Sequence, residues 1–139
     1  MIIRRAKADD AAALTDCIAA AYAPYQHLGL PPVAEGVGDD IARHTVWVAE
    51  DDAILGGLVA VIDDRFYLAN LAVHPDAGGR GVGRALITHA EGVAQRLGYT
   101  EIALATHTGM TGTQAFYHRI GWVEVGREGN KVHFSKQLD

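Results

Sequence analysis

The sequence predicts an α/β fold in which helices pack on a mixed β-sheet. Three β-rich runs separated by acidic two-residue turns occupy residues 45–73, a pattern typical of antiparallel hairpins. A strand, a glycine-rich loop, a helix and another strand fill residues 66–105, and this order places the last strand parallel to the first. A Gly129-Asn130 turn joins two further β-rich runs and favours a closing hairpin.

The first half of the chain is expected to form four strands, one long helix and a short second helix after a loop. Asp9-Asp10 can cap the long helix, in which Leu14, Ile18 and Ala21 share one face. Prolines and glycines break up residues 24–38, and so long a loop in a compact domain is usually functional. The fourth strand is apolar on both faces, which predicts a central place in the sheet. The expected ranges are a strand at 2–7, a helix ending at 22, and strands at 45–50, 54–62 and 66–73.

The second half is expected to contain two helices between the remaining strands. Phe116 and Ile120 lie one turn apart in the shorter helix, where we expect them to supply the core-facing pair before Gly121 stops it. Gly98 is expected to end the longer helix as a left-handed cap. The longer helix has five apolar residues at helical spacing, which predict a buried stripe: Val82, Leu86, Ala90, Val93 and Leu97. The expected strands cover residues 101–105, 122–128 and 131–138.

Length and composition favour a single globular domain over residues 1–139. Apolar residues make up 49% of the chain and charged residues 21%. No run reaches the ~20 apolar residues of a membrane helix, and no apolar leader follows Met1, so we expect no membrane association and no secretion. The lone Cys17 excludes internal disulfides and fits the cytoplasm, as a core residue rather than a nucleophile. A net charge of −5 disfavours nucleic-acid binding and is compatible with an amine substrate.

The most informative segment is Gly-Gly-Arg-Gly-Val-Gly-Arg at residues 78–84, between a strand and a helix. Glycines let the backbone N–H groups approach a ligand, and the helix N-terminus adds a positive dipole end, which together suit a phosphate or diphosphate. The spacing fits neither a P-loop, which needs Gly-Lys-Ser/Thr, nor a G-x-G-x-x-G dinucleotide fingerprint. Taken alone, the segment is equally compatible with a flexible turn that allows close helix packing.

Two motifs at a defined separation resemble those of the GNAT superfamily of N-acetyltransferases. Residues 71–86, which run from Leu-Ala-Val-His-Pro into the glycine loop, look like motif A, and residues 115–122, Ala-Phe-Tyr-His-Arg-Ile-Gly-Trp, look like motif B. The opening Ile-Arg-Arg-Ala at 3–6 with Asp9 is similar to the first strand and helix start of that family. The resemblance implies a seven-stranded mixed sheet flanked by about four helices, with the fourth and fifth strands splayed apart around acetyl-CoA.

The resemblance also assigns the cofactor-binding residues. The backbone of Leu71, Ala72 and Val73 would bind the pantetheine arm like an added strand, with the Val73 N–H a candidate donor to the thioester oxygen. One departure is Gly78, where the family usually has Gln or Arg; Arg80 could compensate or could be a solvated surface residue. The diphosphate would lie on the main-chain N–H groups of the glycine loop and helix start: Gly78, Gly79, Arg80, Gly81, Val82, Gly83 and Arg84.

Tyr117 matches the general acid of the family, which protonates the departing CoA thiolate. A tyrosine with its ordinary pKa near ~10 is protonated at neutral pH and can donate. The alternative is a packed aromatic residue whose hydroxyl is hydrogen-bonded. The asparagine that often stands seven residues earlier is Met110 here, which we expect to fill space at the cleft wall, and the frequent carboxylate at the end of the fifth strand is Ala105.

Without that carboxylate the general base is open. His107 could act directly or through water, or be a plain loop residue, and Glu35 is a second candidate. Asn70 could orient the substrate or be a buried, hydrogen-bonded amide. Tyr25 and His27 either line the acceptor pocket or lie on the surface.

The sequence therefore predicts direct transfer of an acetyl group from acetyl-CoA to a primary amine of a small molecule or peptide. The seven histidines lack the close pairs of a metal site, so we expect no metal. One alternative is a non-catalytic acyl-CoA-binding or regulatory module, because residues 78, 105 and 110 depart from the family pattern. Another is a longer acyl donor, whose pocket Met110 and Leu71 could shape. The resemblance also allows a homodimer.

Overall fold

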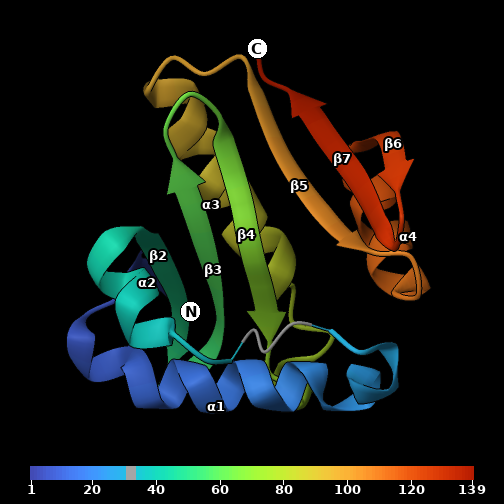
Figure 1. Cartoon of the computed structure of the whole chain (residues 1–139). Coiled ribbons are helices and arrows are strands. Elements are labelled where there is room, and N and C mark those ends of the chain that lie inside the picture. The colour runs from blue at the N-terminus through green and yellow to red at the C-terminus, as the bar shows by residue number, and fades with distance from the viewer. Residues whose placement is uncertain (31–33) are drawn as a thin grey trace.

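The computed structural model describes residues 1–30 and 34–139, which form one seven-stranded sheet with helices on both faces (Figure 1). Residues 31–33, part of the loop expected at 24–38, lie outside the described residues. The strands are β1 (Ile2–Arg5), β2 (Thr45–Asp51), β3 (Ala53–Ile62), β4 (Phe66–Val73), β5 (Glu101–His107), β6 (Val123–Glu128) and β7 (Lys131–Gln137). The helices are α1 (Ala11–Tyr22), α2 (Val37–Arg43), α3 (Val82–Arg96) and α4 (Thr111–Arg119), with short 3₁₀ turns η1 (Ala8–Asp10), η2 (Ala23–Leu28) and η3 (Pro75–Ala77).

The strand order is β1-β2-β3-β4-β5-β7-β6. Every neighbouring pair is antiparallel except β4 and β5, which are parallel because α3 connects them as a crossover. The parallel fifth strand, the central fourth strand and the closing hairpin predicted from the sequence are therefore confirmed.

Two hydrophobic cores lie on opposite faces of the sheet. Successive residues of a strand point to opposite faces, so in β2 Trp47 belongs to one core while Val46 and Val48 belong to the other. The helices α3 and α4 cover the first face, and α1 with the start of α2 covers the second. Figure 1 shows α1 crossing one end of the sheet, with α3 on the far side of β3 and β4.

The two halves of the sheet separate between β4 and β5. Their parallel pairing covers only Phe66–Leu68 against Ile102–Leu104, after which β4 continues to Val73 on β3, and β5 continues to His107 on β7. The register between β3 and β4 shifts at Val59/Ala60, which leaves Ala69 as an extra residue on β4. Such a bulge bends a strand and increases its twist. The resulting V-shaped opening is the splay predicted for the fourth and fifth strands (Figure 1).

The helix details differ from the sequence-based expectations at three places. Asp10 does not cap α1 with its side chain, because its carboxylate instead accepts the backbone N–H of Lys7 and binds Arg4. Leu97 is 59% exposed, since it is the C-cap residue beyond the last turn of α3, and Ile87 and Ala94 are buried in its place. The loop expected from residue 24 begins instead with η2.

Substitution of Gly56 by alanine should destabilise the fold. A Cβ at Gly56 would lie 2.7 Å from the Ala72 carbonyl oxygen and 3.0 Å from Val82 Cγ1, and the backbone oxygen cannot rotate away. We expect Gly56→Ala to lower the free energy of unfolding by about 1–3 kcal/mol in urea titrations. Gly126→Ala on β6, where nothing lies within 4 Å, is the control, and equal effects of the two changes would contradict this packing.

The ion pair between Asp10 and Arg4 should make the stability of the N-terminal corner decrease at acid pH. Two hydrogen bonds from the Arg4 guanidinium (2.8 and 3.0 Å) lower the pKa of the Asp10 carboxyl from 3.8 to about 2. Because the folded-state pKa is the lower one, the stabilisation is full above about pH 4 and disappears as pH falls through about 2. We expect Asp10→Asn to cost on the order of 2 kcal/mol at pH 7 and much less at pH 2. Asp39→Asn, in the exposed pair with Arg43, should change unfolding little at either pH.

Candidate active site

A cavity of about 520 Å³ occupies the opening between the splayed strands. Five elements line it: the end of α1 with η2, the free end of β4, the glycine loop with the first turn of α3, the end of β5, and α4. These segments are distant in sequence, and the loss of pairing between β4 and β5 brings them together. Most of the residues that the sequence singled out as candidates line this cavity.

The end of β4 presents an unpaired backbone edge to this cavity. Leu71, Ala72 and Val73 pair with β3 on one side, but the pairing with β5 has already ended at Leu68. All three line the cavity, as expected for residues that bind an extended ligand by main-chain hydrogen bonds.

The glycine loop leads into a helix start with free N–H donors. Gly79 (φ +79°) and Gly81 (φ +75°) adopt left-handed backbone, which requires glycine and turns the chain into α3. The first main-chain bond of α3 runs from the Ala85 N–H to the Gly81 carbonyl (3.0 Å), and among the described residues no side chain caps the helix. The N–H groups of residues 82–84 thus have no intrahelical acceptor, at the positive end of a 15-residue helix.

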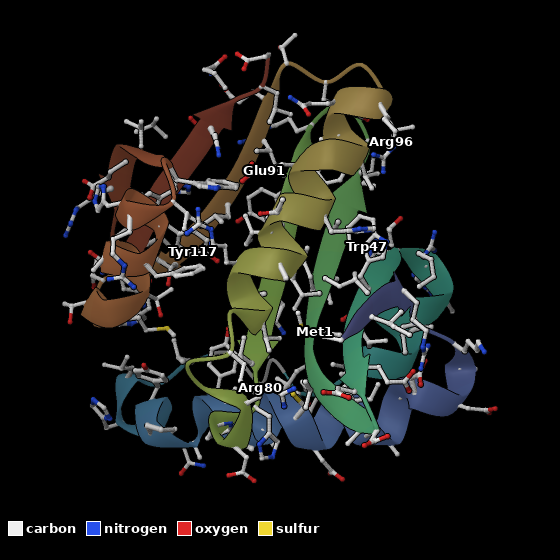
Figure 2. All side chains as sticks on the ribbon, turned by 180° about the vertical axis from the view of Figure 1, so that it is seen from behind. Met1, Trp47, Arg80, Glu91, Arg96 and Tyr117 are labelled. Atoms are coloured by element: carbon white, nitrogen blue, oxygen red, sulfur yellow. The ribbon has the colours of Figure 1, made fainter. Side chains whose placement is uncertain are left out.

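The structure separates the loop residues into two groups. Gly79, Gly81, Val82, Gly83 and Arg84 line the cavity. Gly78 and Arg80 are outside this lining: the Gly78 N–H closes the η3 turn on the Pro75 carbonyl (3.2 Å), and Arg80 pairs with Asp51 (2.6 Å). Figure 2 shows Arg80 at the loop that precedes α3.

Phe116 and Ile120 pack against the core as expected, but both are only half-buried, and Tyr117, with 4% of its surface exposed, is the buried residue of α4. Its ring packs against Trp122 and Phe134 at centroid distances of 5.6 and 5.8 Å, and Phe116 is only half-buried. Tyr117 nevertheless lines the cavity, and within residues 1–30 and 34–139 no hydrogen bond engages its hydroxyl. Burial raises the pKa of Tyr117 above its ordinary value of 10, so the phenol stays protonated and able to donate.

The two base candidates do not line the cavity. His107 ends β5, and its Nδ1 accepts the Gly109 N–H (2.9 Å). This bond occupies the lone pair that a neutral ring would use to take a proton, because its own proton is then on Nε2. Glu35 is exposed in the turn before α2.

A second phenol reaches the cavity from the opposite side. Tyr22, at the end of α1, donates a hydrogen bond to Asn70 Oδ1 (3.0 Å), and both residues line the cavity together with Tyr25. Burial raises the pKa of Tyr22 to about 12, so this hydroxyl is also neutral. The sequence reasoning missed Tyr22, although its position four residues after the buried Ile18 placed it on the same helix face.

The end of β5 and the start of α4 close the remaining wall. Ala105 and Thr106 line the cavity, and the Thr106 hydroxyl approaches Met110 Sδ at 3.8 Å. Met110 is 8% exposed and fills the wall, as expected from the sequence. Arg119 also lines the cavity and was not singled out by the sequence, since a charged residue near a helix end is usually only solvated.

Glu91 of α3 links the two halves of the sheet behind Tyr117. One carboxylate oxygen binds the Lys136 ammonium of β7 (2.9 Å), and the other accepts the indole N–H of Trp122 (3.2 Å). Trp122 in turn packs on the Tyr117 ring, and its backbone N–H donates to the Tyr117 carbonyl (2.9 Å). Figure 2 shows Glu91 on α3 and Tyr117 on the neighbouring α4. This network fixes the position of α4 relative to α3.

Removal of the Glu91 carboxylate should loosen this junction. Glu91→Ala leaves the Trp122 indole N–H and the Lys136 ammonium without their partner, and we expect a loss of about 1–3 kcal/mol in unfolding free energy. Glu91→Gln, which retains an oxygen for Trp122, should lose less. The control is Glu124→Ala, which breaks the more exposed pair with Arg127, and an equal loss there would contradict a structural role for the junction.

Residues 1–30 and 34–139 contain no cluster of histidine, cysteine and acidic side chains that could hold a metal ion. Within the same residues, none of the helices has both the length and the apolar character needed to cross a bilayer.

Comparison with known proteins gives matches in sequence and in structure. Residues 42–124, more than half of the chain, match the family model of the GNAT acetyltransferase domain, while no curated protein matches the sequence. The structure is similar to the PaiA N-acetyltransferase of Thermoplasma acidophilum in complex with coenzyme A (TM-score 0.87, 18% identity, 99% of this chain and 98% of that chain).

Two other solved structures show the same arrangement over nearly the whole chain. A GNAT-family acetyltransferase of Staphylococcus aureus Mu50 has a TM-score of 0.84 with 15% identity, covering 99% of each chain. The ribosomal-protein-S18-alanine N-acetyltransferase of Escherichia coli has a TM-score of 0.80 with 19% identity, covering 99% of this chain and 93% of that chain. At these identities the likeness concerns the fold.

Proposed function

This chain belongs to the GNAT acetyltransferase family, and from that premise we propose that it transfers an acetyl group from acetyl-CoA to a primary amine by direct attack in a ternary complex. The observation that carries the proposal is the convergence on one cavity of three groups: free N–H donors at the start of α3, an unpaired β4 edge and the hydroxyl of Tyr117. The Thermoplasma relative, whose structure contains coenzyme A, supports the choice of donor.

The start of α3 would bind the diphosphate of the coenzyme. The free N–H groups of residues 82–84 point out of the helix end, where the dipole favours an anion, and the Arg84 side chain adds a positive charge. A Cβ at Gly83 would lie 3.4 Å from Val73 Cγ2, so the glycine keeps this helix turn close to β4. Gly78 and Arg80 would shape the loop from outside the cavity.

The free edge of β4 would hold the pantetheine arm. Leu71 and Val73 offer N–H and C=O groups along the edge that β5 has left, whereas those of Ala72 face β3, as the bond from the His74 N–H to the Leu55 carbonyl (2.8 Å) indicates. An extended chain can bind along this edge as an added strand. The Val73 N–H would donate to the thioester oxygen, where negative charge develops as the amine attacks. The chain thus positions and orients the reacting carbonyl.

Tyr117 would serve as the general acid. The amine nitrogen forms a bond to the thioester carbon, the C–S bond breaks, and the sulfur takes the phenolic proton. The nitrogen then loses its extra proton to water in the cavity, and the phenolate regains a proton from water, which completes the cycle. The raised pKa of Tyr117 keeps this proton in place throughout the neutral range. The packing of Trp122 and Phe134 fixes the ring, which limits the hydroxyl to one side of the cavity.

The acceptor ammonium must lose a proton before it attacks. No described residue of the cavity lining is a carboxylate or an imidazole, so we propose that water in the cavity accepts this proton. The sequence-based assignment of the base to His107 stays a prediction. His107 could act in this way only after giving up its hydrogen bond from Gly109.

Replacement of Tyr117 by phenylalanine should remove the acid with little change in packing. In a thiol-release assay over a panel of amines, we expect Tyr117→Phe to lower kcat by about 10²-fold or more, with the KM for acetyl-CoA changed less than about twofold. Tyr99→Phe is the matched control, because the Tyr99 hydroxyl binds the Asp63 carbonyl far from the cavity lining. Unchanged turnover in Tyr117→Phe would remove this residue from the mechanism.

The wild-type protein tests the broader proposal in the same assay. Calorimetric titration with acetyl-CoA should give binding, and at least one amine should release thiol. Binding without turnover on any amine would support a non-catalytic acyl-CoA module instead, and no binding would overturn the proposal altogether.

A further inference from the structure

The cavity lining and the whole chain have charges of opposite sign. The chain carries a net charge of −5, whereas the described lining contains two arginines, Arg84 and Arg119, and no aspartate or glutamate. Residues 31–33, which are not described, are Pro-Pro-Val in the sequence and carry no side-chain charge. The acidic residues that make the protein anionic are therefore elsewhere than in this lining.

The cavity joins the two faces of the sheet, and its ends differ in chemistry. At the end near the start of α3, Arg84 and free N–H groups suit the phosphates of the coenzyme. At the end near α1 and η2, the lining is apolar or neutral. Its members include Ala21, Tyr22, Tyr25 and Asn70, with Ala105, Thr106 and Met110 facing them from the end of β5 and the start of α4, while Arg119 lies at the far end of α4.

The polar side chains at this second end are a phenol and an amide, and both are neutral. The Tyr22 hydroxyl donates to Asn70 Oδ1, so the side-chain acceptors left at this end are uncharged oxygen lone pairs, which stabilise an ammonium group less than a carboxylate does. The rings of Tyr22 and Tyr25 meet edge to face with centroids 6.5 Å apart, which presents an aromatic surface.

An acceptor with several ammonium groups would bind poorly in such a site. The reacting ammonium loses its charge on deprotonation. Each additional ammonium group would have to move out of water into a cavity that offers it no carboxylate, which costs free energy. Arg119 in the lining would repel it further, whereas Arg84 would already be paired with the phosphates of the coenzyme. A monoamine with an apolar or aromatic body has no extra ammonium group to desolvate or to be repelled by arginine, and its body can pack against the tyrosine rings.

We propose that the acceptor is a monoamine with an apolar or aromatic body, and that the cavity rejects polyamines and other polycations. This inference rests on the proposed acetyl transfer and goes beyond it in naming the acceptor class. The net charge of the chain is compatible with any cationic substrate. It does not determine which class of amine is accepted, because that selection depends on the charges that line the site.

The direct test compares phenethylamine with spermidine in the thiol-release assay on the wild-type protein. We expect kcat/KM to be at least about tenfold higher for phenethylamine, with the difference arising mainly in KM. A preference for spermidine would overturn this inference and leave acetyl transfer intact. Acetyl-CoA binding with no turnover of either amine, or of any other in the panel, would overturn both.

A gain-of-function variant tests the electrostatic reason. Ala21 lines the second end and is half-buried, so Ala21→Asp would add a carboxylate there, and Ala21→Asn is the neutral control of the same shape. We expect kcat/KM for spermidine to be about tenfold higher in Ala21→Asp than in Ala21→Asn, and to fall toward the control at high salt. Equal spermidine activity in the two variants, both folded by circular dichroism, would contradict the role assigned to the missing carboxylate.

Discussion

The early end of pairing between β4 and β5 is the constraint on which the rest of the structure depends. The two strands stay together for three residue pairs, up to Leu68 and Leu104, and then diverge because each keeps its other partner. The divergence frees the main-chain edge of β4 and opens a passage between the faces of the sheet. Since α3 starts immediately beside that edge, the free amides of a strand and of a helix end face the same space.

A sheet divided in this way needs other contacts to hold its halves together. On one face, Glu91 joins α3 to Lys136 and to the indole of Trp122. Leu28 of η2 packs so closely on Gly109, after β5, that a Cβ there would lie 2.7 Å from Leu28 Cδ2. Contacts between segments distant in sequence therefore join the two halves.

The sequence by itself determined the fold class, the element order and the glycine loop that leads into α3. These features depend on local patterns: alternating apolar residues make strands, the glycines at 79 and 81 take left-handed backbone, and the adjoining helix start offers free N–H groups whatever surrounds it. Tyr117 could also be identified as the candidate general acid from sequence, because it lies within a motif at a defined separation from the glycine loop. The strand boundaries that local patterns set were correct to within about two residues.

Only the tertiary structure decided which polar side chains reach the cavity. Tyr22 and Arg119 line it, whereas Arg80 pairs with Asp51, and His107 binds its own loop through Gly109. The reason is geometric: a side chain reaches the site according to how its strand or helix packs on distant segments. The sign of the charge inside the cavity follows from the same packing. The overall charge of an acidic chain therefore did not reveal a lining whose described residues include arginine but neither aspartate nor glutamate.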